Sequence, residues 1–172
     1  VADYEGNDIL TRRFSGYLQA LEESGIPFRP EYIFPFTPSY EGGIEAGKKI
    51  AGGRNEITAV VTTADICAIG VMEGARLSGY RIPIDLSVIG FDNLKLCQYT
   101  VPKLTSISQN IPLKAKTAVT LLLEQIRSGA LSQSGHVQMD VEIVERQSVV
   151  SLFWSRPLLT KNVDRLQENP RF

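Results

Sequence analysis

The spacing of apolar and polar residues along the chain predicts an alternation of helices and strands. Apolar residues that recur every three or four positions indicate amphipathic helices, and a glycine follows the end of each one. Short runs of β-branched and aromatic residues between polar breaks indicate strands. The predicted helices cover residues 8–24, 39–51, 65–77 and 113–128, and the predicted strands cover residues 32–34, 58–62, 86–90, 104–108 and 136–145.

Helices that alternate with strands predict an α/β fold with a doubly wound, mostly parallel sheet flanked by helices. Residues 136–145 alternate between apolar and polar side chains, so this strand is expected at a sheet edge or as a bridge to another body. The helix over 39–51 contains three glycines that weaken it intrinsically, so tertiary packing must hold it. The helix over 113–128 is expected to bury Val119, Leu122, Leu123 and Ile126.

Two predicted strands are each followed by an aspartate. Asp65 comes after the strand over 58–62, and Asp92 comes after the strand over 86–90. Small ligands bind outside the carboxyl ends of the strands in open α/β sheets. Both aspartates are therefore expected at the rim where a ligand would lie.

Composition excludes several classes of function. The 172 residues carry a net charge of -1, so the chain has no electrostatic footprint for nucleic acid. No apolar stretch approaches the roughly 18 residues of a membrane span, and a cytoplasmic location is expected. Cys67 and Cys97 lack metal-ligand spacing and are interpreted as reduced thiols. His136 is the only histidine, which disfavours hydrolase chemistry and a metal site, so no cofactor and no enzyme activity is predicted.

Three motifs resemble one known family. The segments IPIDLSVIGFDN, VPKLTSISQNI and VEIVERQSV follow one another in the order and spacing of LacI/GalR-type transcriptional regulators, whose effector-binding core has the periplasmic-binding-protein type I fold. The similarity spans about residues 4–150. The resemblance implies a sensor of two lobes with a small molecule between them, and an amino-terminal helix-turn-helix that contacts operator DNA.

The resemblance also implies a domain organisation. Residues 1–150 would form part of the effector-binding domain, with 1–110 and 136–148 in its carboxy-terminal lobe and the helix over 111–129 crossing to the amino-terminal lobe. Residues 151–172 would form a tail. The sheet begins at a helix whose preceding strand is missing, so the chain is expected to be a carboxy-terminal piece without the DNA-binding headpiece.

By the same resemblance, several residues are candidates for effector contact. Arg13, in the sequence Arg-Phe-Ser-Gly, matches an arginine that forks onto effector hydroxyl or carboxylate groups, a task that suits a planar guanidinium. Asp92 matches an aspartate that accepts hydrogen bonds from the effector. Asp65 matches a second aspartate and is either a contact or a helix N-cap. Its usual asparagine neighbour is replaced by Ala64, so the effector cannot be copied from sugar-binding relatives.

The remaining candidates are matched more loosely. An aromatic ring usually stacks on the effector after the second strand, and Phe36 and Tyr40 compete for that place, with Phe36 preferred because it directly follows the predicted strand. Asn7 lies near a loop that carries polar contacts in relatives. Gln109 lies where the chain crosses between lobes and is either a hinge residue or a contact.

The sequence therefore predicts a ligand-sensing domain of a transcriptional regulator that binds a sugar, a nucleoside or a purine-like compound. A homodimer is expected, with Ile69, Leu96 and Tyr99 at its interface. A periplasmic sugar-binding transport receptor with the same fold is the alternative. An α/β enzyme is a third reading, but none of the common glycine-rich phosphate-binding or nucleophile motifs is present.

Overall fold

The computed structural model describes residues 8–53, 57–128 and 137–151. Three predictions therefore lie outside the described residues: the polar contact at Asn7, the strand start at His136 and the tail from residue 152 onward. No helix in the described ranges is long and apolar enough to cross a membrane.

A four-stranded sheet in the order β1-β2-β3-β4 forms the centre of the fold. β1 (Ala59–Val61), β2 (Ser87–Phe91) and β3 (Thr105–Ser108) are parallel, and β4 (Glu142–Val144) pairs antiparallel with β3. In the register, Val60 lies beside Val88. The prediction of a mostly parallel sheet is confirmed, and so is the place of the last strand at a sheet edge, although β4 is shorter than the predicted 136–145.

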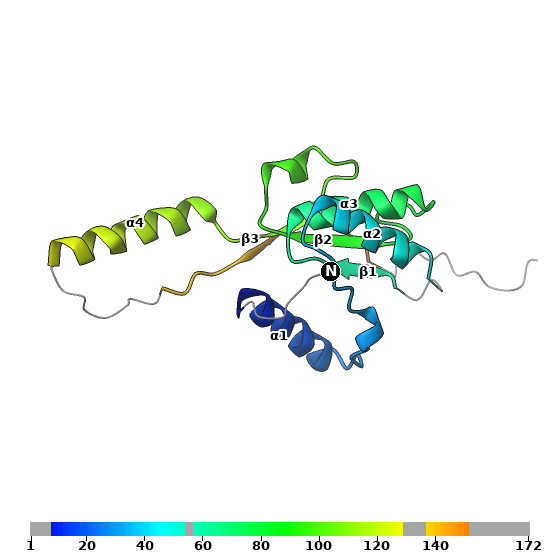
Figure 1. Ribbon diagram of the computed structural model, residues 1–172, viewed down its shortest axis with the longest axis horizontal. Coiled ribbons are helices and arrows are strands. Elements are labelled where there is room, and N and C mark those ends of the chain that lie inside the picture. Colours follow the sequence, from blue (N-terminus) through cyan, green and yellow to red (C-terminus); the bar gives the residue numbers. More distant parts are fainter. Residues whose placement is uncertain (1–7, 54–56, 129–136, 152–172) are drawn as a thin grey trace, which may run out of the picture.

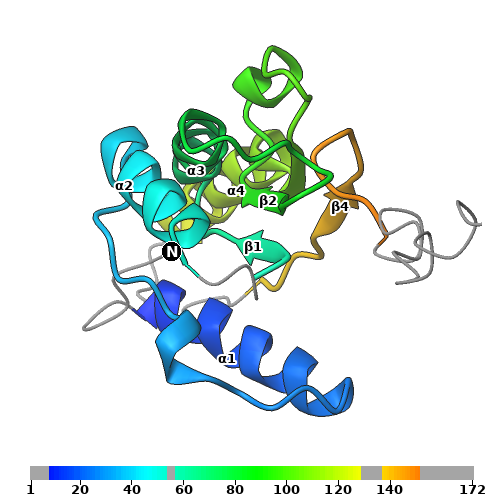
Figure 2. The ribbon, with the colours of Figure 1, turned by 90° about the vertical axis from the view of Figure 1, so that its right-hand side faces the viewer.

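Helices cover both faces of this sheet (Figures 1 and 2). α1 (Asp8–Glu23) lies on one face, while α2 (Tyr40–Ala51) and α3 (Asp65–Leu77) lie side by side on the other. The core between α2, α3 and the sheet consists of buried apolar side chains, among them Ala46, Val71, Leu86, Val88 and Leu104. The doubly wound architecture expected from the alternation of elements is therefore confirmed.

Glycines let α2 and α3 pack backbone against backbone. A Cβ atom added at Gly43 or Gly47 of α2 would overlap backbone atoms of α3, and one added at Gly70 or Gly74 would overlap backbone atoms of α2. Because no side chain fits between the helices, the four positions require glycine. This contact is the tertiary packing that the glycine-rich sequence of α2 requires, and Ser39 caps the helix by accepting a hydrogen bond from the N–H of Gly42 at 3.1 Å.

The strand predicted over residues 32–34 is wrong. Pro30–Tyr32 form a short 3-10 helix, and residues 33–38 belong to no strand. Prolines at 30, 35 and 38 lack the N–H that a sheet ladder needs, so the aromatic run resembles a strand in composition only.

α4 (Ile111–Ser128) projects from the compact body, and Figure 1 shows it extending beyond the end of the sheet. Its four expected core residues are exposed by 45–67%, so the burial predicted for them is not found in this chain. Residues 137–141, which precede β4, run back along the same arm. The apolar periodicity is real, and the structure describes no segment that covers it. The exposed positions are Val119, Leu122, Leu123 and Ile126.

Candidate functional site

Arg13 reaches from α1 to the carboxyl ends of the neighbouring parallel strands β1 and β2. One of its guanidinium nitrogens donates a 2.6 Å hydrogen bond to the carbonyl of Thr63, which follows β1. The guanidinium carbon lies 3.7 Å from the ring centroid of Phe91, the last residue of β2. Partial burial lowers the pKa of Arg13, and the neighbouring Asp92 carboxylate opposes that shift. The guanidinium is therefore held over the strand ends with a carboxylate close by.

The loop after β2 holds Asp92 in an unusual backbone conformation. Asp92 has φ of 113° and Asn93 has φ of 52°, both in the region that side chains rarely adopt. The N–H of Asp92 donates to the carbonyl of Ile107 on β3 at 2.8 Å. Such a turn persists only where its surroundings stabilise it, so the neighbouring hydrogen bonds determine where the Asp92 carboxylate lies.

The side-chain carboxylate of Asp65 stabilises this loop. Its side chain is fully buried, and its carboxylate accepts hydrogen bonds from the Ser106 hydroxyl at 2.5 Å and from the N–H of Leu94 at 2.7 Å. The same Ser106 hydroxyl accepts the N–H of Asn93 at 3.0 Å. Asp65 thus acts on the two residues that follow Asp92 in the chain.

Arg146 stabilises the loop from the side of β4. Its guanidinium donates to the Asn93 side-chain oxygen at 2.6 Å and to the carbonyl of Leu104 at 2.7 Å. Two residues on, the buried Ser148 hydroxyl donates to the carbonyl of Val88 and accepts the N–H of Thr105. The Arg-x-Ser sequence therefore joins the segment after β4 to β2, β3 and the Asp92 loop.

Gln109 completes a polar cluster at the strand ends. It follows β3 directly, and its side-chain amide donates a 2.5 Å hydrogen bond to the Asp92 carboxylate. The cluster thus combines a guanidinium, a carboxylate and an amide, which together can donate to and accept from a small polar molecule. Of the predicted site residues, the structure brings Arg13, Asp92 and Gln109 together.

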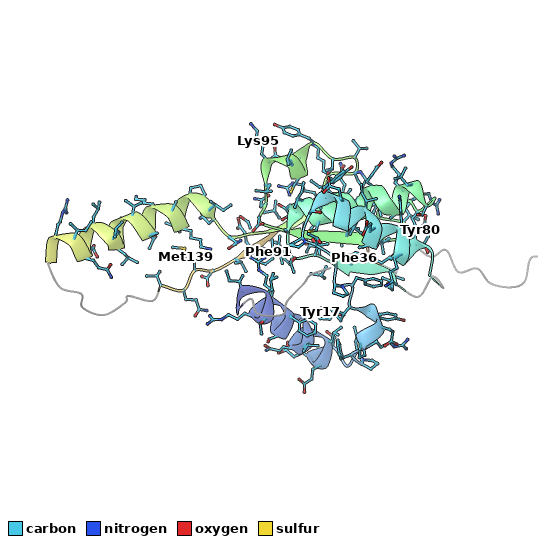
Figure 3. All side chains as sticks on the ribbon, viewed as in Figure 1. Tyr17, Phe36, Tyr80, Phe91, Lys95 and Met139 are labelled. Carbon is cyan, nitrogen blue, oxygen red and sulfur yellow. The ribbon has the colours of Figure 1, made fainter. Side chains whose placement is uncertain are left out.

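Three other predicted contacts are placed elsewhere. Phe36 packs against the core with Lys49 Nζ 5.8 Å from its ring centroid, and Figure 3 shows it further along α2, away from Phe91. Tyr40, the first residue of α2, lines a cavity between α3 and the loops over 80–82 and 100–102. Asp65 has no exposed surface, and it is the first helical residue of α3 after the N-cap Ala64. Asp65 is therefore neither the N-cap of α3 nor an exposed contact. Its two carboxylate oxygens accept hydrogen bonds from the loop after β2 and from β3.

Phe91 is the aromatic ring at this site, and the sequence reasoning missed it. Figure 3 shows it at the end of the sheet that faces α4. The sequence signal that could have identified Phe91 is its position immediately before Asp92, at the end of a predicted strand. The ring is expected from the resemblance to follow the strand predicted over 32–34, which points to Phe36, but these residues form no strand.

A second surface lies beside α3, between that helix and the loops over 80–82 and 100–102. A cavity of about 350 Å³ opens there, and Ile69 of α3 lines it together with the loop over 100–102. Leu96, Tyr99 and Val101 are exposed by 48%, 64% and 94%. This surface contains the three residues predicted for a dimer interface, Ile69, Leu96 and Tyr99, and the interface stays a prediction.

Comparison with known proteins matches residues 3–149 to the periplasmic binding protein-like domain family. The chain is 37% identical over 140 residues to the HTH-type transcriptional repressor CytR of Escherichia coli K12, covering 81% of this chain and 41% of that protein. It is 37% identical over 137 residues to the HTH-type transcriptional repressor PurR of Yersinia pestis, covering 80% of this chain and 40% of that protein.

Among solved structures, a LacI family transcriptional regulator from Enterococcus faecium with bound ribose has a TM-score of 0.72 at 30% identity. That match covers 80% of this chain and 50% of the solved chain. This chain therefore spans about two fifths of the length of these curated relatives and half of the solved one.

Proposed function

The chain belongs to the periplasmic binding protein-like domain family, and from this membership we propose that it is the effector-sensing part of a LacI/GalR-type transcriptional regulator. Two relatives are named as transcriptional repressors, and a LacI family neighbour of known structure carries ribose. The effector of the present protein is a small polar molecule of the sugar, nucleoside or purine class. It binds without being chemically changed.

The observation that supports this proposal is the cluster of Arg13, Asp92 and Gln109 at the carboxyl ends of β1, β2 and β3. One nitrogen of the planar guanidinium donates to the carbonyl of Thr63, and its other N–H groups can donate to effector oxygens. The Asp92 carboxylate accepts hydrogen bonds from hydroxyl or ring N–H groups. Phe91 supplies apolar surface next to both charges. Ligands of open α/β sheets bind at this edge of the sheet.

A second lobe covers this edge in the proposed protein. Residues 1–110 and 136–148 form one lobe, and the helix within 111–129 crosses into the other. Support comes from the exposed apolar side chains of α4 and from those of the segment beside it, where Val141 and Ile143 are 58% and 61% exposed. An apolar surface of this extent is a common mark of an interface. Effector bound between the lobes favours one relative orientation of them.

Regulation then follows from differential affinity. The effector shifts the equilibrium between two lobe orientations by no more than the difference in its affinity for them, typically a few kcal/mol. In the proposed cytoplasmic protein, two copies associate through the surface that contains Ile69, Leu96 and Tyr99. Their amino-terminal headpieces then bind operator DNA with a spacing that depends on lobe orientation.

A periplasmic sugar-binding transport receptor is the alternative, because it shares the fold and the position of the site. The named relatives favour the regulator. The gene sequence upstream of this segment separates the two: a helix-turn-helix supports the regulator, and a signal peptide supports the receptor.

The site is tested by calorimetric titration of the complete protein with D-ribose, adenosine, cytidine and hypoxanthine. We expect Arg13→Ala and Asp92→Ala each to weaken binding of the responding compound at least about tenfold, the effect of losing about 1.4 kcal/mol. Arg12→Ala on the same helix is the matched control, because Arg12 is exposed and makes none of the contacts described for Arg13. Unchanged affinity in both site variants would remove the assignment.

A further inference from the structure

A chain of hydrogen bonds crosses the junction between the compact body and the projecting arm. Gln109 donates from its side-chain nitrogen to the Asp92 carboxylate at 2.5 Å. Its side-chain oxygen accepts from Lys114 Nζ, in the first turn of α4, at 3.2 Å. One amide thus connects the loop after β2 to α4, and we call this set of three residues the Asp92–Gln109–Lys114 relay.

The Asp92 end of the relay is fixed. The residues that follow Asp92 bind the buried Asp65, the Ser106 hydroxyl and the Arg146 guanidinium, with distances between 2.6 and 3.0 Å. Its own N–H is bound to β3. Any movement that breaks the relay therefore takes place at Gln109 and beyond it, not at Asp92.

The other end of the relay has few other restraints. Asn110, next to Gln109, has φ of 48°, and α4 begins at the following residue. Lys114 is exposed, and α4 leaves the body there, as Figure 1 shows. On the α4 side, the arm is held by the few bonds at residues 109–114, which include the N–H of Lys114 to the carbonyl of Asn110 and the N–H of Leu113 to the Asn110 side chain. On its other side the arm continues into β4, which pairs with β3.

We propose that the Asp92–Gln109–Lys114 relay holds the arm in the orientation that the structure shows, and that an effector opens it by taking the Asp92 oxygen to which Gln109 donates. An effector hydroxyl or N–H competes with the Gln109 amide for the same acceptor. Once displaced, Gln109 no longer fixes Lys114, and α4 is free to take the second orientation. This inference rests on the proposed function, because it supplies the step that couples the site to lobe movement.

The relay is tested without any effector, by hydrogen exchange of the complete protein read by mass spectrometry. Gln109→Leu breaks both bonds of the relay at similar side-chain size, and Lys114→Met breaks only the distal one. Each should speed exchange of the amides over 109–114 about threefold or more, since a lost charge-assisted bond destabilises the turn it closes. Lys116→Met is the matched control, because Lys116 is exposed on the same helix and lies outside the relay.

Coupling separates the relay from a general loosening of the helix. In the Gln109→Leu/Lys114→Met double variant, exchange should be no faster than in the faster single variant, because both changes break one relay. Asp92→Ala should reproduce the same acceleration, since it removes the acceptor as an effector would. Unchanged exchange in both single variants, an equal effect of Lys116→Met, or additive effects would each overturn the proposal. None of these results depends on effector binding, so the relay and the proposed function fail or stand separately.

Discussion

Replacing Asp65 by alanine tests whether the buried carboxylate stabilises the loop that carries Asp92. The side chain is fully buried and accepts two short hydrogen bonds, from the Ser106 hydroxyl and from the N–H of Leu94. Asp65→Ala therefore leaves the buried Ser106 hydroxyl and the partly buried N–H of Leu94 without their acceptor.

The size of the effect follows from these contacts. Hydrogen bonds to a charged group contribute about 1.5–3 kcal/mol each, and leaving a buried donor unpaired costs about 1–3 kcal/mol. Removing a buried charge also recovers part of its desolvation cost, so the contributions do not add fully. We expect Asp65→Ala to lower the free energy of unfolding by about 3 kcal/mol, and Ser106→Ala to lower it by about half as much.

The assay is urea unfolding of the complete protein followed by circular dichroism, with the slope checked so that a change in midpoint reports stability. Asp85→Ala is the control, because Asp85 forms an exposed ion pair with Arg81 and should change stability far less. Asp65→Asn, which keeps the shape and one acceptor, should fall between wild type and alanine. A loss below about 1 kcal/mol in Asp65→Ala would refute the role assigned to this carboxylate.

Two further predictions concern the helix layer and the thiols. Gly47→Ala should destabilise the protein by about 1–3 kcal/mol, because its Cβ would overlap the α3 backbone. Gly16→Ala on α1 should stabilise it by about 0.5–1 kcal/mol, because a Cβ there meets nothing within 4 Å. Equal effects of the two variants in urea unfolding would contradict the packing described. Burial, with the Asp65 carboxylate, raises the pKa of the Cys97 thiol to about 12. Since only an accessible thiolate reacts, and Cys97 has no exposed surface, native Cys97 should resist iodoacetamide at pH 9 and react readily in urea. Rapid native labelling at pH 9 would contradict this environment.

The helices and parallel strands could be predicted because their signals are local. Periods of three to four residues, the cap at Ser39 and the glycines after the helices place α1 to α4 within a few residues of the structure. The strand over 32–34 failed because its aromatic run outweighed the prolines around it. The apolar periodicity of α4 predicted the helix correctly. Periodicity alone does not indicate whether the same chain contains a surface that buries the apolar side of the helix.

The chemistry of the site could be predicted only in part. Arg13 and Asp92 followed from the resemblance of their motifs, and the structure places them together. The role of Asp65 depends on partners 29 and 41 positions away in sequence, Leu94 and Ser106, which no local pattern reveals. The place of Phe91 under the Arg13 guanidinium likewise depends on how α1 crosses the strand ends.

The most direct test of the sensor proposal is a crystal structure of the complete protein bound to the compound that responds in the calorimetric titration. The account predicts that the compound lies at the carboxyl ends of β1 to β3, with polar groups within hydrogen-bond distance of both Arg13 and Asp92 and with a second lobe closed over it. A compound bound elsewhere, with Arg13 and Asp92 free of it, would contradict the account.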